Sequence, residues 1–397
     1  AQADRKKDQA ERKHTLEKQE NLEVKQGEIV DIKIENGEVM AIKTSEELEL
    51  LMKKHKVDTV WSWSRLNCYK SSPYEFYLKY ILKEPEDAEP SIYGVQGGMI
   101  HEIIERFYLG EIKYEDMINE YEDCLLGLQM QGLKYNRVDD ESDRKVGDKY
   151  EGCIRHFFQN HKPFTQQMHI EKFIDIKVGK HLYQGYIDAL CKINGKIHIL
   201  DWKSSTEYTG DKAQKELGQL KLYAYGLYKK GFKAEDIVVG WVFLKYYTFT
   251  FTQKNGKEKS MNIERITDPM EVKTIKSNVE SKIKELGYDI EEYKDCKFNE
   301  LPDDVKYFYK VEDCMTLFSH TAEQLEEFAK EVEDKTDEIV ERIKEYEETQ
   351  DEEVWLGEVI DAKNVFYFFN LCGYTTKKHK PFAEYIELSK MFMIEED

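Results

Sequence analysis

The sequence predicts an α/β protein with a mixed central sheet flanked by helices and a helical carboxyl-terminal region. Strand patterns and a two-residue hairpin turn fill residues 168–203. A helical pattern at about 211–228 is followed by an apolar strand at 238–244. Because strands and helices alternate here, and because helical periodicity dominates beyond about residue 268, we expect one sheet with helices packed against it.

Composition limits the class of protein. The chain has 397 residues, 40% of them hydrophobic, which is enough for two or three substructures. Its formal net charge of -20 is the reverse of the basic excess of many nucleic-acid binders, so any DNA must bind in a local groove. Seven cysteines without a CxxC pair are typical of reduced thiols, and no apolar run is long enough to span a bilayer. We therefore expect a cytoplasmic protein without a membrane partner.

Three regions are expected along the chain. Residues 1–56 are predicted to form a charged arm, a hairpin with its turn at Asn36-Gly37, and a short helix. Residues 57–260 are predicted to form the core, and residues 261–397 a mainly helical, acidic region packed on that core. We find no function for the hairpin arm in the sequence.

The core begins with helices. Residues 66–82 have helical character interrupted at Pro73. The pair Gly97-Gly98 precedes an amphipathic helix that carries His101 on or beside its apolar stripe. A lone histidine on a helix is most often structural, so only its surroundings can give His101 a chemical role.

An apolar stripe at near-heptad spacing runs through the acidic region. It predicts a long helix at about 321–348 with one face packed on the core. A coiled-coil partner is the alternative. The stripe consists of Leu325, Phe328, Val332, Ile339, Ile343 and Tyr346.

The register of one hairpin brings charged residues together. If Asn194-Gly195 is a two-residue turn, residues whose numbers sum to 389 face each other, so Asp188 opposes Asp201. Side chains alternate along a strand, so Lys203 projects from the same face as Asp201. Two carboxylates and an amine are therefore predicted to converge.

Opposed carboxylates destabilise a hairpin unless a positive charge offsets them. A divalent cation with hard oxygen ligands, Mg²⁺ or Mn²⁺, would do so. The alternative is that Lys203 merely neutralises the two aspartates on a solvated sheet face. We favour the metal because Leu190, Ile197 and Ile199 share that face, and charges beside an apolar surface are costly without a purpose.

Five motifs follow one another along the chain. They are the helical opening at 63–77, the helix segment Gly98-Met99-Ile100-His101, the strand segment Gln184-Gly185-Tyr186-Ile187-Asp188, the segment Asp201-Trp202-Lys203, and the pair Gln219 and Tyr223. In this order they resemble the PD-(D/E)XK nuclease superfamily and specifically its RecB-type branch, in which a QxxxY motif such as Gln219 and Tyr223 follows the catalytic lysine. The resemblance covers roughly residues 60–245 and implies a restriction-endonuclease-like core over 57–260.

The resemblance implies a role for each residue of the site. Asp188, Asp201 and the backbone carbonyl of Trp202 would hold one or two divalent ions, with His101 as a nitrogen ligand. Lys203 would orient the attacking water and stabilise charge in the transition state. Gln219 and Tyr223, on one helix face, would contact DNA or brace the catalytic loop.

The implied function is a divalent-metal-dependent DNA nuclease. We expect an end-dependent exonuclease of phage or bacterial recombination, repair or replication, similar to the CRISPR-adaptation and phage recombination nucleases. Its partners would be DNA with a free end or in single-stranded form, and a helicase or single-strand-binding protein. Some of these relatives bind an iron–sulfur cluster, but here Ser72 stands where a cysteine is usual, with Cys68 and Cys372 as isolated thiols. We therefore expect no cluster.

Rival hypotheses remain open. An endonuclease could use the same site, and a catalytically idle nuclease fold could serve as a DNA-binding or inhibitory scaffold. The hypothesis of a zinc peptidase has little support, because Glu105 occupies the position of the second histidine in an HExxH motif. Four aromatic residues, Tyr69, Tyr74, Trp202 and Tyr223, are candidate stacking surfaces for bases, although packing in the core is the commoner role. The basic run 377–380 is a further candidate phosphate contact.

Overall fold

The structure is a computed structural model that describes residues 32–35, 38–41, 45–135 and 139–394. It divides into two units, up to Val60 and from Trp61 onward. The first unit contains β1 (Ile32–Glu35) paired with β2 (Glu38–Ala41), and the helix α2 (Ser45–His55). The predicted hairpin is confirmed by the pairing of Glu35 with Glu38, while its Asn36-Gly37 turn and the charged arm lie outside the described residues.

The larger unit is built on a mixed sheet. Its central strands are ordered β3-β5-β6-β7-β8, with β4 paired to β5 and β9 paired to β7. The β6–β7 pair is parallel and the β4–β5, β5–β6, β7–β8 and β7–β9 pairs are antiparallel, which confirms the predicted fold class. The strands are β3 (Val60–Ser62), β4 (His169–Val178), β5 (His181–Ile193), β6 (Lys196–Lys203), β7 (Ile237–Thr252), β8 (Glu258–Glu264) and β9 (Tyr309–Ser319).

Helices form a first core on one face of the sheet. They pack against inward residues such as Ile199 and Trp241. These helices are α3 (Trp63–Ser71), α4 (Pro73–Phe76), α9 (Gly218–Lys229) and α12 (Ala322–Thr349). The break predicted at Pro73 is confirmed, because Ser72 ends α3 and its hydroxyl caps α4.

The helix predicted at about 211–228 is two helices. The shorter, α8 (Gly210–Glu216), ends at Leu217, where α9 begins. A side chain at Gly218 would place a Cβ 2.1 Å from the ring of Trp63, so close packing of α9 on α3 requires glycine there.

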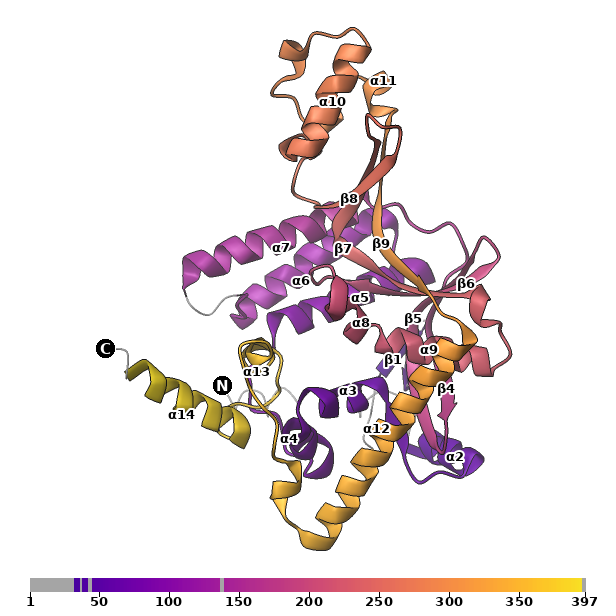
Figure 1. Cartoon of the computed structure of the whole chain (residues 1–397), viewed down its shortest axis with the longest axis vertical. Coiled ribbons are helices and arrows are strands. Elements are labelled where there is room, and N and C mark those ends of the chain that lie inside the picture. Colours follow the sequence, from indigo (N-terminus) through magenta and orange to yellow (C-terminus); the bar gives the residue numbers. More distant parts are fainter. Residues whose placement is uncertain (1–31, 36–37, 42–44, 136–138, 395–397) are drawn as a thin grey trace. The chain divides into compact units, whose positions relative to one another are not determined.

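A second helical layer covers the other face of the sheet (Figure 1). It consists of α5 (Ile92–Leu109), α6 (Met117–Gln131) and α7 (Asp140–Asn160), packed on Leu200 and Trp202. Because Ile199 belongs to the first core and Leu200 to the second, β6 alternates between two buried faces, as a central strand must. The helix α5 begins five residues before Gly97 and contains both glycines.

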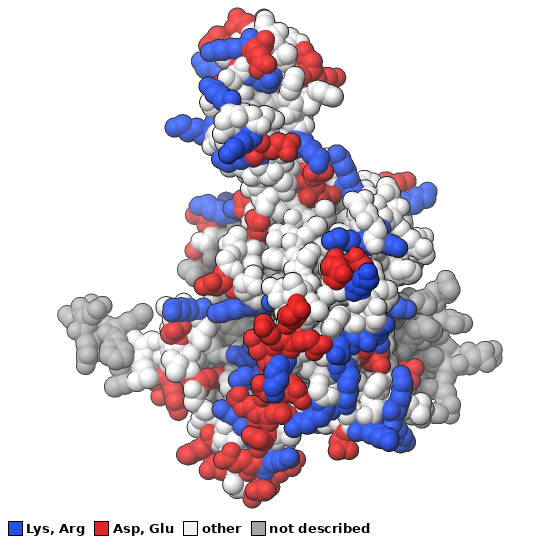
Figure 2. All heavy atoms as spheres, turned by 45° about the vertical axis from the view of Figure 1, so that its right-hand side comes forward, with Lys and Arg blue, Asp and Glu red and all other residues white. Residues whose placement is uncertain are grey.

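The long helix predicted from the apolar stripe is α12. Leu325, Val332 and Ile339 are buried in the first core, so the packed-face interpretation is confirmed. Its sequence holds 12 acidic and four basic residues, a formal charge of -8 out of the chain's -20. Figure 2 shows acidic side chains gathered on the lower part of this view.

The strands β7, β8 and β9 continue into a lobe at the top of Figure 1. There they pack with α10 (Lys273–Glu285) and α11 (Asp303–Lys306) around a third core, which includes Phe249 and Val279. Two short helices, α13 (Val365–Asn370) and α14 (Lys380–Ile394), follow α12. Thus β8 and β9 fall in the region expected to be mainly helical, and the proposed domain boundaries stay a prediction.

Two expectations about composition can be compared with the structure. All seven cysteines are free thiols. In the part of the chain that the structure describes, no helix is both long and apolar enough to cross a membrane.

Candidate active site

The predicted hairpin register is confirmed. Asn194 and Gly195 have φ values of 50° and 83°, as a type I′ turn requires at both central positions. Ile193 pairs with Lys196 and Ala189 with Leu200, and each pair sums to 389. Asp188 and Asp201 come one step further along the two strands. Glycine at 195 makes this possible without strain, since a side chain disfavours such a φ.

Residues from two strands and a helix converge here. One ligand atom each from His101, Asp188 and Asp201 lie within 4.8 Å of one another. His101 Nδ1 is 3.5 Å from Asp188 Oδ2, and Lys203 Nζ is 2.6 Å from Asp201 Oδ2. The other imidazole nitrogen of His101 is hydrogen-bonded to the carbonyl oxygen of Trp202 at 2.5 Å. The five predicted metal-site and lysine positions therefore form one group, contributed by α5, β5 and β6.

The charges of this group act strongly on one another. Burial, together with the charge of Asp201, raises the pKa of Asp188 well above its ordinary value. Burial lowers the pKa of His101, so its imidazole is neutral and able to donate a lone pair. Burial also acts to lower the pKa of Lys203, but the ion pair with Asp201 outweighs it and leaves that pKa raised. Lys203 is thus a fixed cation at neutral pH.

The donor set fits a divalent cation. Asp201 is only 6% exposed, and its Oδ1 is buried without a hydrogen-bond partner among the described residues. An uncompensated buried carboxylate oxygen is costly, and a metal ion would satisfy it. Two carboxylates, a neutral imidazole and a backbone carbonyl are ligands that Mg²⁺ and Mn²⁺ accept. A metal bound there would polarise a phosphate oxygen and acidify a water.

The helix α9 places two further predicted residues beside the carboxylates. Gln219 Nε2 donates to the Tyr223 hydroxyl at 3.0 Å. Burial, with contributions from the charges of Asp188 and Asp201, raises the pKa of Tyr223 to about 12. A Cβ at Gly185 would lie 2.5 Å from the Tyr223 ring, so this tyrosine reaches β5 only because residue 185 is glycine. Tyr223 therefore packs against the strand that carries Asp188, and Gln219 contacts Tyr223.

Two neighbours of the site gave no signal in the sequence. Glu171 on β4 has a left-handed φ of 48°, and its charge acts on both Asp188 and Tyr223. Tyr208 lies in the loop after Lys203 and packs edge-on against Trp241 and Phe243. Neither belongs to a periodic pattern or to a quoted motif, so only the fold reveals their position.

Two alternatives raised by the sequence find no support, and packing in the core, the commoner role of the four aromatic residues, is confirmed. Tyr69, Tyr74, Trp202 and Tyr223 are between 2% and 4% exposed, so they are core residues and offer no stacking surface to bases. Three members of the basic run 377–380 are paired or buried: Lys378 binds Glu84, Lys380 pairs with Glu352, and His379 is fully buried. Lys377 is exposed, but the run as a whole is not a free basic cluster for phosphates.

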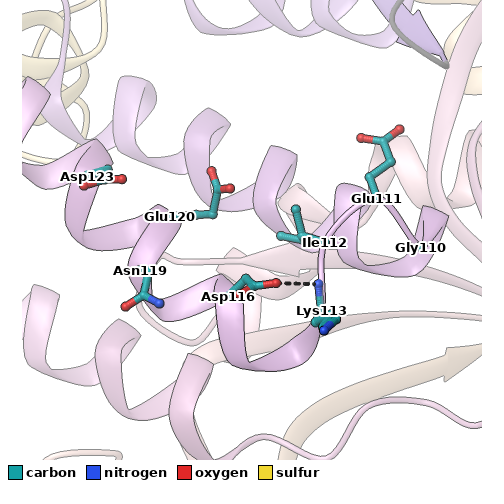
Figure 3. A pocket seen from close by; sticks show the side chains of 8 residues that line it. All are labelled: Gly110, Glu111, Ile112, Lys113, Asp116, Asn119, Glu120 and Asp123. Atoms are coloured by element: carbon teal, nitrogen blue, oxygen red, sulfur yellow. Dashed lines mark hydrogen bonds between the residues drawn. The ribbon is translucent and has the colours of Figure 1, made fainter.

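A separate hollow lies just beyond the end of α5. Figure 3 shows its lining, which includes Glu111, Asp116, Glu120 and Asp123. Arg106 offsets part of this charge through its 2.9 Å contact with Glu120. Four carboxylates repel a phosphodiester, so this hollow does not suit a nucleic-acid strand.

A histidine on α5 and two aspartates and a lysine on the mixed sheet form a group whose chemistry suits metal-dependent hydrolysis of phosphodiester bonds. Comparison with known protein families identifies the class of protein more closely. The family model of the PD-(D/E)XK nuclease superfamily matches residues 60–355, and the chain belongs to that superfamily. It is therefore a metal-dependent nuclease by family, with nucleic acid as its substrate, and the predicted resemblance is confirmed at the level of the superfamily.

A solved structure titled "Crystal structure of SSO0001" is 14% identical to this chain. The match covers 52% of this chain and 82% of that one, with a TM-score of 0.15. At this TM-score the likeness says nothing about arrangement or function.

Proposed function

We propose that this protein is a divalent-metal-dependent DNA exonuclease of the RecB-type branch, which hydrolyses phosphodiester bonds from a free end. The observation that carries the proposal is the grouping of His101, Asp188 and Asp201 with Lys203. In this proposal the first three residues and the Trp202 carbonyl hold the metal. Lys203 orients the attacking water and offsets charge on the phosphate.

Dependence on a free end is inferred from charge. A formal net charge of -20 gives little long-range attraction to duplex DNA, so productive binding depends on a narrow basic groove. A narrow groove favours a single threaded strand, and threading requires an end. A helicase or single-strand-binding protein would supply such a strand in recombination, repair or replication.

The choice of metal follows from the ligands. An imidazole nitrogen binds Mn²⁺ better than Mg²⁺, while carboxylates accept both. We expect activity with either ion and a higher activity with Mn²⁺ at equal concentration. We expect no iron–sulfur cluster. The position of Ser72 supports this, since its hydroxyl caps α4 and binds His379, which leaves it in a polar network rather than beside a set of thiolates.

The test compares matched linear and covalently closed circular single-stranded DNA, each digested in Mn²⁺ with a chelator control. We expect rapid loss of the linear substrate, a much slower loss of the circle, and no digestion with chelator. Equal initial rates on the two would refute the exonuclease and favour an endonuclease that uses the same site. Absence of digestion of either would favour an idle scaffold.

A further inference from the structure

The register of β6 and β7 identifies a residue next to the catalytic group. The strands are parallel, and Asp201 is paired with Trp241 and Lys203 with Phe243. Paired residues of neighbouring strands project from the same face of a sheet. Trp241 and Phe243 are buried in the first core, so Asp201 and Lys203 lie at the border of that core.

Tyr208 covers this border. Its ring centroid is 5.1 Å from that of Trp241 and 5.4 Å from that of Phe243, and both rings stand at 89° to it. Edge-to-face packing on two fully buried rings fixes the plane of Tyr208. The loop from Ser204 to Thr209 thus returns Tyr208 to the sheet face from which Lys203 projects.

Charged groups of the catalytic site lie near enough to Tyr208 to act on its hydroxyl. Burial raises its pKa, so it is a protonated hydrogen-bond donor at neutral pH, and the charges of Lys203 and Asp201 both act on it. The Ser205 side chain lies within hydrogen-bonding reach of the same hydroxyl.

A second cation borders the same ring. Lys212, an exposed residue of α8, places its Nζ 4.9 Å from the centroid of Tyr208. The ring of Tyr208 therefore combines a neutral donor with a neighbouring ammonium group, close to Lys203. This combination is suited to an anion such as a phosphodiester.

We propose that Tyr208 and Lys212 form a subsite for a backbone phosphate next to the scissile one, with the hydroxyl donating to a non-bridging oxygen. The proposal rests on the proposed function, because its ligand is the nucleic-acid strand. Lys212 adds charge without fixed geometry, whereas Tyr208 is held by its two aromatic neighbours and fixes the position of the strand. The subsite would set which phosphate reaches Lys203.

The test uses Tyr208→Phe, which keeps the ring and its packing. The substrate is a labelled single-stranded oligonucleotide in Mn²⁺, with a neutral methylphosphonate placed at one phosphate at a time. We expect kcat/KM of the variant to fall about tenfold, as for loss of a hydrogen bond to a charged group. At one methylphosphonate position the variant and the wild-type protein should become equal, because the contact is already lost. Lys212→Gln should reduce the salt dependence of KM by about one ion.

The matched control is Tyr225→Phe. Tyr225 also lies beneath a lysine, with Lys229 Nζ 5.4 Å from its ring, and is 4% exposed. Loss of the hydroxyl in Tyr225→Phe should leave kcat/KM unchanged. Melting temperatures equal to that of the wild-type protein would show that packing is intact in both variants.

Three outcomes would overturn the subsite. If Tyr208→Phe stays within twofold of an active wild-type protein, the hydroxyl contacts no phosphate, while the proposed function stands. If the variant is slower but its effect adds to that of every methylphosphonate, Tyr208 acts only on Lys203. If the wild-type protein cleaves no nucleic acid, the proposed function and the subsite fall together.

Discussion

The two carboxylate oxygens of Asp201 have different surroundings. Oδ2 pairs with Lys203, while Oδ1 is buried and has no hydrogen-bond partner in the described chain. Asp201→Asn should therefore abolish cleavage, since loss of a metal ligand costs orders of magnitude. Asp188→Asn should do the same. The measurement is a single-turnover rate in Mn²⁺, with circular dichroism to check the fold.

The matched control is Asp175→Asn on β4, where the carboxylate pairs with Lys230 at the surface. This change removes a charge from a neighbouring strand without touching the metal site, and full activity is expected. Retention of more than roughly a tenth of activity in Asp201→Asn would refute its role as a ligand.

The contribution of Lys203 to the rate should be separable from metal binding. Lys203→Met removes a cation 2.6 Å from Asp201, so the Mn²⁺ affinity should be kept or increased. The single-turnover rate should fall about 10²- to 10³-fold, because charge on the transition state loses its partner. Calorimetric titration with Mn²⁺ beside the rate measurement tests both. Loss of metal binding with the rate intact would reverse the assignment.

The sequence predicts the opposed aspartates because a two-residue turn fixes the register of its strands, and the lysine because side chains alternate. It does not predict Tyr208 or Glu171. The position of Tyr208 depends on a loop that folds back on β7, and the left-handed φ of Glu171 has no residue-type signature. The position of a side chain can be predicted from the sequence where a short turn or a regular strand fixes it. It cannot be predicted where the path of a loop fixes it.

At the scale of elements, a buried polar network joins α4 to the segment after α12. Ser72 Oγ lies 3.0 Å from His379 Nε2, and Glu358 Oε1 lies 3.2 Å from the same nitrogen. Burial raises the pKa of Glu358 to about 7 and lowers that of His379 to about 4. Burial thus favours the neutral form of both side chains, through pKa shifts in opposite directions.

These shifts predict a pH dependence of stability. A raised carboxyl pKa means that the fold prefers the protonated form, so the stabilisation present below pH 4.5 is lost as the pH rises through 7. Glu358→Gln should match the wild-type protein near pH 4.5. At pH 8 it should exceed the wild type in free energy of unfolding by an amount on the order of 2–3 kcal/mol.

The measurement is urea unfolding of both proteins at pH 4.5 and pH 8. His379 contributes in the other direction: its stabilisation is present above about pH 6.5 and is lost as the pH falls toward 4. At pH 4.5 residue 358 is uncharged in both proteins, and at pH 8 His379 is neutral in both, so the contribution of His379 is similar in the two proteins. A variant less stable than the wild type at pH 8 would contradict the prediction.

Element boundaries differ from the sequence-based expectation where packing decides them. The Gly97-Gly98 pair suggests a helix start, yet α5 runs through it, and a Cβ at Gly97 would meet Ser204 Oγ only at an ordinary contact distance of 3.7 Å. At the start of α9, by contrast, Gly218 lies so close to Trp63 that a side chain would not fit. A glycine read from sequence as a break can equally mark a close approach.

On the scale of the whole chain, the lobe on β7 to β9 has its own apolar core. Its ends are adjacent, because Tyr247 pairs with Asp313. Replacing residues 248–312 by Asn-Gly should therefore leave a folded nuclease core with unchanged Mn²⁺ affinity. Stability should fall, since Arg265, which binds Leu244 O and Asp313, is removed. The measurements are thermal unfolding and calorimetric titration with Mn²⁺. An unfolded product, or one that no longer binds Mn²⁺, would show that the lobe is part of the core.

The lobe was not foreseen from the sequence. Its strands β8 and β9 are short or partly exposed, and they lie amid a helical pattern that dominates the region. The pairing of β9 with β7 joins segments about 70 residues apart, as Val238 with Ser319 and Tyr247 with Asp313 illustrate. Such non-local pairs leave no local signature, whereas the stripe of α12 does.

The Asn194-Gly195 turn is also a site of slow chemical modification. Asparagine before glycine is the sequence most open to succinimide formation, and both residues are exposed. Ring opening to isoaspartate would add a methylene to the backbone of a two-residue loop and displace β6 relative to β5. Stored protein would then lose activity as the isoaspartate fraction grows, without any cleavage of the chain. The variant Asn194→Asp keeps the backbone length, so it separates the effect of the added charge from the effect of the longer backbone. The measurement is the activity of stored protein, compared with its isoaspartate content at successive times.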